Sequence, residues 1–124
     1  MLSQALITKA IFVAKKSNVD RAKVGAILFT KRGHIVASAC NKRFESVIGS
    51  AKFTIHAEES LIAKGFRIKA AERFDSLNIL VVRWLKGEQI LGMAKPCRKC
   101  QKILQIAKIK SIFYSDKNGC IKQK

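Results

Sequence analysis

The sequence predicts an α/β domain in which helices pack on a sheet. Three observations lead to this fold class. The chain has 124 residues, 48% of them hydrophobic, which is enough to bury one core but not two. Apolar patterns typical of helices and of strands alternate along the chain. No repeat or low-complexity segment interrupts them. We therefore expect residues 1–124 to form a single domain.

The first half of the chain predicts a helix, a hairpin and a second helix. Residues 2–18 carry apolar side chains at helical spacing, which indicates an amphipathic helix. Two short apolar runs, 23–30 and 34–40, are joined by the tripeptide KRG and predict a hairpin. The next apolar pattern predicts a helix that opens near Thr54 and stops at Gly65.

The second half predicts strands around a third helix. Residues 77–84 are almost continuously apolar, as in a strand covered on both faces. Residues 85–94 predict a turn and a short return strand. A helix is expected over 97–108, with Pro96 in its first turn. Residues 109–114 predict another strand, which the turn signal SDKNG joins to a last short strand, CIKQK.

Composition limits the class of protein. No apolar run approaches the roughly 20 residues that span a bilayer. Lysines interrupt the first apolar stretch, which is atypical of a signal peptide. We expect a soluble, intracellular, cytoplasmic protein with no membrane partner. Four unevenly spaced cysteines are too few for a disulfide scaffold and favour metal ligands or buried thiols.

The charge indicates an anionic partner. Twenty-five Lys and Arg oppose eight Asp and Glu, for a formal net charge of +17. The basic residues are spread along the chain. A field of this size attracts phosphate, and most simply a polynucleotide. A compositional bias toward Lys is the alternative explanation, but such a bias would also supply more Glu.

The segment PCRKC suggests a metal site. Cys97 and Cys100 can share one helix face, and a helix start makes both thiols easier to ionise. A redox pair would follow the first strand of its fold, and here the motif comes late. A closed structural zinc site would need a second Cys or His pair at short spacing, which the chain lacks. His56 at the start of the second predicted helix completes a three-ligand site with an open fourth position.

Glu58 suits a chemical role at that site. It lies two residues after His56 and need not be a ligand. Its carboxylate can take a proton from a water that zinc has made acidic and deliver it to the group under attack. This arrangement fits hydrolysis at an amidine-like carbon, where a ring nitrogen is protonated and ammonia leaves.

Together, H-A-E at His56–Glu58 and P-C-x-x-C at Pro96–Cys100 resemble the zinc-dependent cytidine and deoxycytidylate deaminase superfamily. Either motif alone is weak, but the pair is specific, and the resemblance covers most of the chain. It implies a three-layer cytidine-deaminase-like fold, with a mixed sheet of about five strands and helices packed on both faces. It also implies homo-oligomers, since many relatives are dimers or tetramers.

The resemblance also assigns roles to individual residues, with Zn²⁺ as the cofactor. By resemblance, the zinc ligands are His56, Cys97 and Cys100, the proton shuttle is Glu58, and the substrate contacts are Asn41 and the Ala57 backbone.

Some residues depart from the family pattern. Free cytidine deaminases tend to follow the Asn with Val-Glu, whose Glu holds the ribose hydroxyl, whereas here Lys42, Arg43 and Phe44 follow. This favours a substrate that bears phosphate, with Phe44 able to stack on a base. Arg98 lies at a helix start, where phosphate would approach. We expect all four residues to contact substrate. Lys95 lies where the family usually has Glu, Phe or Ser before Pro-Cys.

Several substrates stay open. The favoured hypothesis is conversion of cytosine to uracil in single-stranded nucleic acid. The alternative is a free pyrimidine nucleotide such as dCMP or CMP. A final antiparallel hairpin would favour this alternative, because nucleic-acid editors of the family tend to have a helix there and a parallel fifth strand. Adenine as the target is a third hypothesis. A nucleic-acid-binding protein with a structural zinc is a fourth, and Glu58 argues against it.

Overall fold

The computed structural model describes residues 2–19, 22–45, 52–68, 74–85 and 90–123. In chain order, its elements are α1 (Gln4–Ala14), β1 (Ala22–Phe29), β2 (Ile35–Cys40), β3 (Lys42–Glu45), β4 (Lys52–Ile55), α2 (Ala57–Ile68), a 3-10 turn (Phe74–Ser76), β5 (Asn78–Leu85), β6 (Ile90–Gly92), α3 (Arg98–Ile106), β7 (Ser111–Asp116) and β8 (Gly119–Lys122). Among these helices, none combines the length and apolar character that crossing a bilayer requires.

A mixed sheet forms the centre of the molecule. Its strand order is β2-β1-β5-β7-β8, and β6 adds a sixth strand by pairing with the end of β5. Strand β1 is antiparallel to both β2 and β5, while β5 and β7 are parallel. Strand β8 returns antiparallel to β7, as the turn signal SDKNG predicts. The expected α/β class is confirmed, with one strand more than the five expected.

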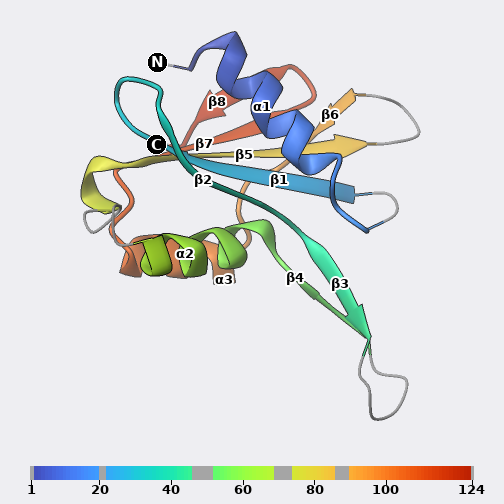
Figure 1. The fold of residues 1–124 in the computed structure, drawn as a ribbon. Helices are drawn as coiled ribbons and strands as arrows, with labels where there is room; N and C mark the ends of the chain where they lie inside the picture. Colours follow the sequence, from blue (N-terminus) through green and yellow to red (C-terminus); the bar gives the residue numbers. More distant parts are fainter. Residues whose placement is uncertain (1, 20–21, 46–51, 69–73, 86–89, 124) are drawn as a thin grey trace.

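Helices cover both faces of this sheet, so the domain has three layers (Figure 1). Helix α1 lies on one face, and α2 and α3 lie side by side on the other. Alternate residues of the central strands point to opposite faces. The core under α1 includes Leu6, Ala10, Ile27, Leu80 and Val82. The core under α2 and α3 includes Leu28, Leu61, Ile79, Val81 and Leu104.

The predicted helix boundaries need correction. Helix α2 begins at Ala57 rather than near Thr54, because the preceding residues pair as β4, and it runs past Gly65 to Ile68. Pro96 lies before the N-cap residue Cys97 of α3 and not in the first turn. Helix α1 is shorter than expected and begins after Ser3, whose hydroxyl accepts the Leu6 amide hydrogen bond. The predicted turn at 86–89 lies outside the described residues.

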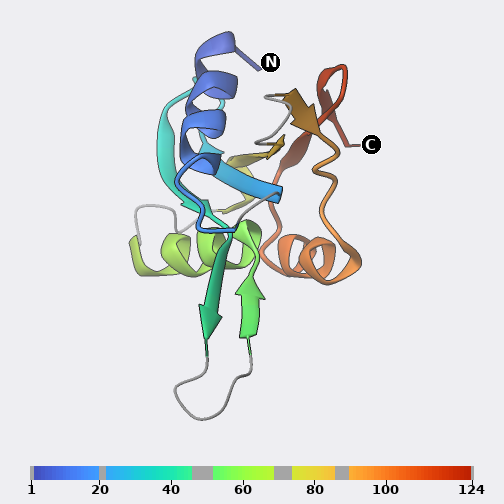
Figure 2. The ribbon, with the colours of Figure 1, turned by 90° about the vertical axis from the view of Figure 1, so that its right-hand side faces the viewer.

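A two-stranded ribbon of β3 and β4 was not expected. Within the described part of the chain, the two strands pair only with each other, from Lys42 opposite Ile55 to Glu45 opposite Lys52. Figure 2 shows the ribbon projecting away from the body of the domain, beyond the layer of α2 and α3. Side chains after α1 hold its base: the Ser17 hydroxyl donates to the Asn41 carbonyl, and the Asn18 amide pairs with both backbone groups of Arg43.

Candidate active site

Two helix starts bring three predicted metal ligands together. His56 immediately precedes α2, Cys97 is the N-cap of α3, and Cys100 is the third residue of that helix. His56 Nδ1 lies 3.2 Å from Cys100 Sγ and 3.7 Å from Cys97 Sγ. All three ligand atoms lie within 4.8 Å of one another, although 41 residues separate His56 from the first cysteine. The three side chains are therefore positioned to bind one metal ion.

The spacing and chemistry of this cluster fit zinc. Bonds of about 2.3 Å to sulfur and about 2.1 Å to nitrogen place tetrahedral N and S ligands about 3.6 Å apart. The observed distances of 3.2 and 3.7 Å bracket that value. Two thiolates and a neutral imidazole also balance the charge of the ion. Burial raises the pKa of the Cys100 thiol, so without a metal this sulfur stays protonated. Metal binding at the site must then displace that proton.

Glu58 is a buried acid next to the ligand cluster. It lies in the first turn of α2 and is only 5% exposed. Burial raises the pKa of its carboxyl; a hydrogen bond with the backbone, the charge of His56 and a hydrogen bond with the Cys100 thiol lower the pKa by less. The side chain is thus held where a carboxyl can exchange a proton with a group in the pocket.

Glu59, in the first turn of α2, connects the starts of α2 and α3. Its Oε1 accepts a hydrogen bond from the His56 backbone N–H at 3.2 Å, as the N3 acid of a capping box does. Its Oε2 forms an ion pair of 3.2 Å with Lys99 of α3. One carboxylate therefore links the residue before α2 to the first turn of α3, and so connects the histidine ligand to the helix of the cysteine ligands.

A pocket of about 330 Å³ opens beside the cluster and contains Glu58. The ends of β1 and β5, the start of α2 and the segment before Cys97 surround it. Asn41 and Ala57 both line this pocket. The Asn41 amide accepts a hydrogen bond from Val24 N–H at 2.9 Å and donates to the Ala22 carbonyl at 3.0 Å. Among the described residues, one lone pair and one N–H of the amide form no further hydrogen bond.

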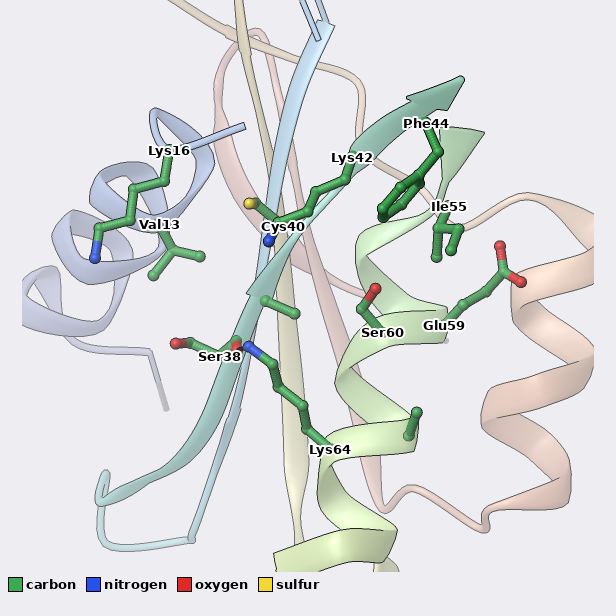
Figure 3. Close-up of a pocket in the computed structure, with 12 residues that line it drawn as sticks. Val13, Lys16, Ser38, Cys40, Lys42, Phe44, Ile55, Glu59, Ser60 and Lys64 are labelled. Atoms are coloured by element: carbon green, nitrogen blue, oxygen red, sulfur yellow. Dashed lines mark hydrogen bonds between the residues drawn. The ribbon is translucent and has the colours of Figure 1, made fainter. Parts of the chain in front are cut away.

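The other predicted substrate contacts lie outside the lining of this pocket. Lys42 and Phe44 line a separate hollow of about 530 Å³, between α1, β2 and α2 (Figure 3). Figure 3 places them with Lys16 and Lys64 around that hollow. Arg43 and Arg98 are exposed and line neither cavity. The structure therefore brings Asn41 and Ala57 to the metal site, and places the basic residues beside it.

Arg83 also lines the pocket, although no sequence motif predicts it. It lines the cavity together with Lys95, the residue before Pro96. The sequence feature that could have identified Arg83 is that it is a single cation near the end of the apolar run 77–84. A charge in a strand buried on both faces is unusual and marks a candidate site.

A comparison with protein families agrees with the geometry. The family model of the cytidine and deoxycytidylate deaminase zinc-binding region matches residues 2–116. This match spans every ligand, Glu58 and all elements from α1 to β7. No curated protein matches the chain.

Proposed function

This chain belongs to the cytidine and deoxycytidylate deaminase family, and from that premise we propose that it hydrolyses cytosine to uracil in single-stranded nucleic acid. His56, Cys97 and Cys100 would hold the zinc ion, which when bound would act as a Lewis acid and make water nucleophilic near neutral pH. The remaining work falls to the side chains that bind the base and move protons.

Glu58 is proposed to move both protons of the reaction. The oxygen of water adds to C4 of cytosine, and one of its protons goes to ring nitrogen N3. The other proton goes to the amino group, the C4–N bond breaks, and ammonia leaves while C4 keeps the oxygen as a carbonyl. Burial raises the Glu58 pKa toward neutrality, which suits a carboxyl that must accept and then release a proton.

The distribution of cations around the pocket favours single-stranded nucleic acid as the substrate. Within the pocket, the charged residues besides Glu58 and the ligands are Arg83 and Lys95, both cations. Beyond it, Lys42 and Arg43 are exposed at the base of the projecting ribbon. One nucleotide offers a single phosphate group, which the pocket alone can meet. A polynucleotide can also use the cations outside the pocket, in keeping with the net charge of +17.

A free pyrimidine nucleotide is the second candidate, and one observation favours it. Strand β8 pairs antiparallel with β7. The nucleic-acid editors of the family tend to have a parallel strand at that position. Under this alternative, Arg83 and Lys95 would bind the single phosphate. The cations outside the pocket, such as Lys42 and Arg43, would not contact the substrate.

A parallel assay distinguishes the candidates. Zinc-loaded protein is given dCMP, CMP, single-stranded DNA and single-stranded RNA, at low and at physiological salt, and uracil is measured. We expect uracil to form most efficiently in a polynucleotide, with less at the higher salt. Uracil from dCMP or CMP alone would support the second candidate. If no cytosine reacts while zinc stays bound, both proposals are wrong, and inosine formation from adenine substrates is the next measurement.

Glu58→Gln tests the proton transfer, and Glu59→Gln is the matched control. The first substitution removes the titrating carboxyl and should lower kcat by roughly 10²- to 10⁴-fold. The second changes the neighbouring acid but keeps an oxygen that accepts the His56 hydrogen bond, so most activity should remain. Zinc content is measured in both variants. Equal activity of the Glu58→Gln and native proteins would rule out the proposed role of Glu58.

A further inference from the structure

Arg83 enters the pocket from the last part of β5. It pairs with Val24 of β1 on one side and with Gly92 of β6 on the other. Its backbone N–H donates to the Ser115 hydroxyl at 3.0 Å, and that hydroxyl donates to the Gly92 carbonyl at 2.8 Å. Ser115 is fully buried. The base of the Arg83 side chain is therefore fixed by three strands before any substrate arrives.

Among the residues that the structure describes, one N–H of the Arg83 guanidinium has no partner. This is Nε–H, which is buried from solvent and forms no hydrogen bond. The described residues also give no ion pair between Arg83 and Glu58, the acid of the same pocket. A buried N–H without a partner costs free energy, and more so when it belongs to a cation. Such a group calls for a ligand that satisfies it.

The chemistry of that ligand follows from the guanidinium and from the pocket. Arg presents a planar fork of N–H donors that matches the oxygens of a phosphate or a carboxylate. A cytosine nucleotide, whether free or within a strand, carries phosphate and no carboxylate. Lys95 of the same pocket adds a second positive charge. The two cations therefore make the pocket suited to a nucleoside with its phosphate attached.

We propose that Arg83 binds the phosphate attached to the target nucleoside, an inference that rests on the proposed deamination of cytosine. The phosphate is a monoester in a free nucleotide and a diester in a strand, and the guanidinium can pair with either. Arg83 thereby couples recognition of the phosphate to placement of the base beside Glu58, since both side chains line one pocket.

Kinetics with three substrates test this assignment. Deoxycytidine, dCMP and a short single-stranded DNA with one cytosine are given to the native protein and to Arg83→Gln. We expect kcat/KM for the phosphate-bearing substrate to fall roughly 10- to 100-fold, mostly through KM, while deoxycytidine changes little. A lower kcat/KM for dCMP identifies the phosphate monoester as the ligand, and a lower kcat/KM for DNA identifies the backbone diester. An equal loss on all three substrates, or no loss on any, overturns the proposal.

Arg32→Gln is the matched control, because it removes the same charge from an exposed turn at the opposite end of β1. It should leave all three kcat/KM values close to native. Arg83→Lys keeps the charge but loses the fork of donors, so it should recover only part of the lost kcat/KM. A circular dichroism melt of each variant checks that the protein stays folded.

Measurements of ligand binding test the role of Arg83 independently of whether the protein deaminates cytosine. Affinities for deoxyuridine, dUMP and a uracil-containing strand are measured by calorimetry on zinc-loaded Glu58→Gln, with and without Arg83→Gln. We expect the phosphate-bearing ligands to bind more tightly. Arg83→Gln should remove that advantage for dUMP and reduce it for the strand, which can also contact cations outside the pocket. An undiminished advantage in the double variant refutes the role of Arg83 even if cytosine is deaminated. Loss of the advantage supports that role even if no cytosine is deaminated.

Discussion

Glu58 and Glu59 are adjacent in sequence but lie in different environments. Burial raises the pKa of Glu58, which lies inside the pocket. For Glu59 burial also acts to raise the pKa, but the hydrogen bond from the His56 backbone and the ammonium of Lys99 together lower it. Glu59 therefore stays charged and structural under conditions where Glu58 can exchange a proton. Two identical side chains thus differ in pKa because of their surroundings.

The link made by Glu59 predicts an effect on metal affinity. Glu59→Ala removes both the acceptor for the His56 N–H and the partner of Lys99, so the two ligand-bearing helix starts lose a connection. We expect zinc affinity to fall by about tenfold, at the lower end for residues that support metal ligands. Glu59→Gln keeps the acceptor and should lose less. Competition with a chromogenic chelator measures both; native affinity in Glu59→Ala would refute this role.

At the scale of elements, the approach of α1 to β1 depends on Gly25. A Cβ at this position would lie 2.5 Å from the Ala14 nitrogen and 2.6 Å from the Ala10 carbonyl oxygen. Both are backbone atoms of α1, so a side chain there cannot be accommodated by a change of rotamer. The missing side chain lets the helix lie directly on the strand.

Gly25→Ala should therefore destabilise the protein by about 1–3 kcal/mol, because α1 must shift away from the sheet. Urea unfolding measures the change. Gly92→Ala is the control, since the nearest atoms to its Cβ would belong to the Leu85 side chain, at 3.2 Å and beyond, and not to backbone. A smaller loss is expected there. If both variants unfold at the same urea concentration as the native protein, the close packing of α1 is not as described.

At the scale of the whole molecule, the positive charge exceeds what a single phosphate requires. The formal net charge of +17 is spread over the chain, and the zinc pocket accounts for only two of its cations. Charge of this kind strengthens binding to a polyanion by releasing counterions, and added salt opposes it. The salt dependence of binding therefore reports how many phosphates the protein contacts.

Binding of single-stranded DNA to zinc-loaded Glu58→Gln should weaken steeply with salt. For single strands, log K falls with log salt at a slope of about −0.7 for each phosphate contacted. Contact with about four phosphates would give a slope of about −3. Fluorescence anisotropy across a range of salt concentrations measures it. A slope close to that of one contact would leave the outer cations without a role and support a free nucleotide as the substrate.

Most of the elements could be predicted from the sequence because their signals are local. The apolar run 77–84 and the turn signal SDKNG predict β5 and the final hairpin, and both are found. The ribbon of β3 and β4 was missed because its strands are short, and in the described structure they pair only with each other. None of the ribbon side chains whose exposure the structure describes is buried. A strand without buried positions carries no alternating pattern to detect.

The sequence by itself determined the chemistry of the site: two thiols three residues apart, a histidine, and an acid two residues beyond it. Residue type and spacing suffice for that inference. The tertiary structure alone decided which neighbours share the pocket. Along the strands, Lys42 and Phe44 fall on one side and Asn41 on the other, and Arg83 meets the pocket through its pairing with β1 and β6. Strand register sets the side on which each residue lies, and register depends on contacts between residues distant in sequence.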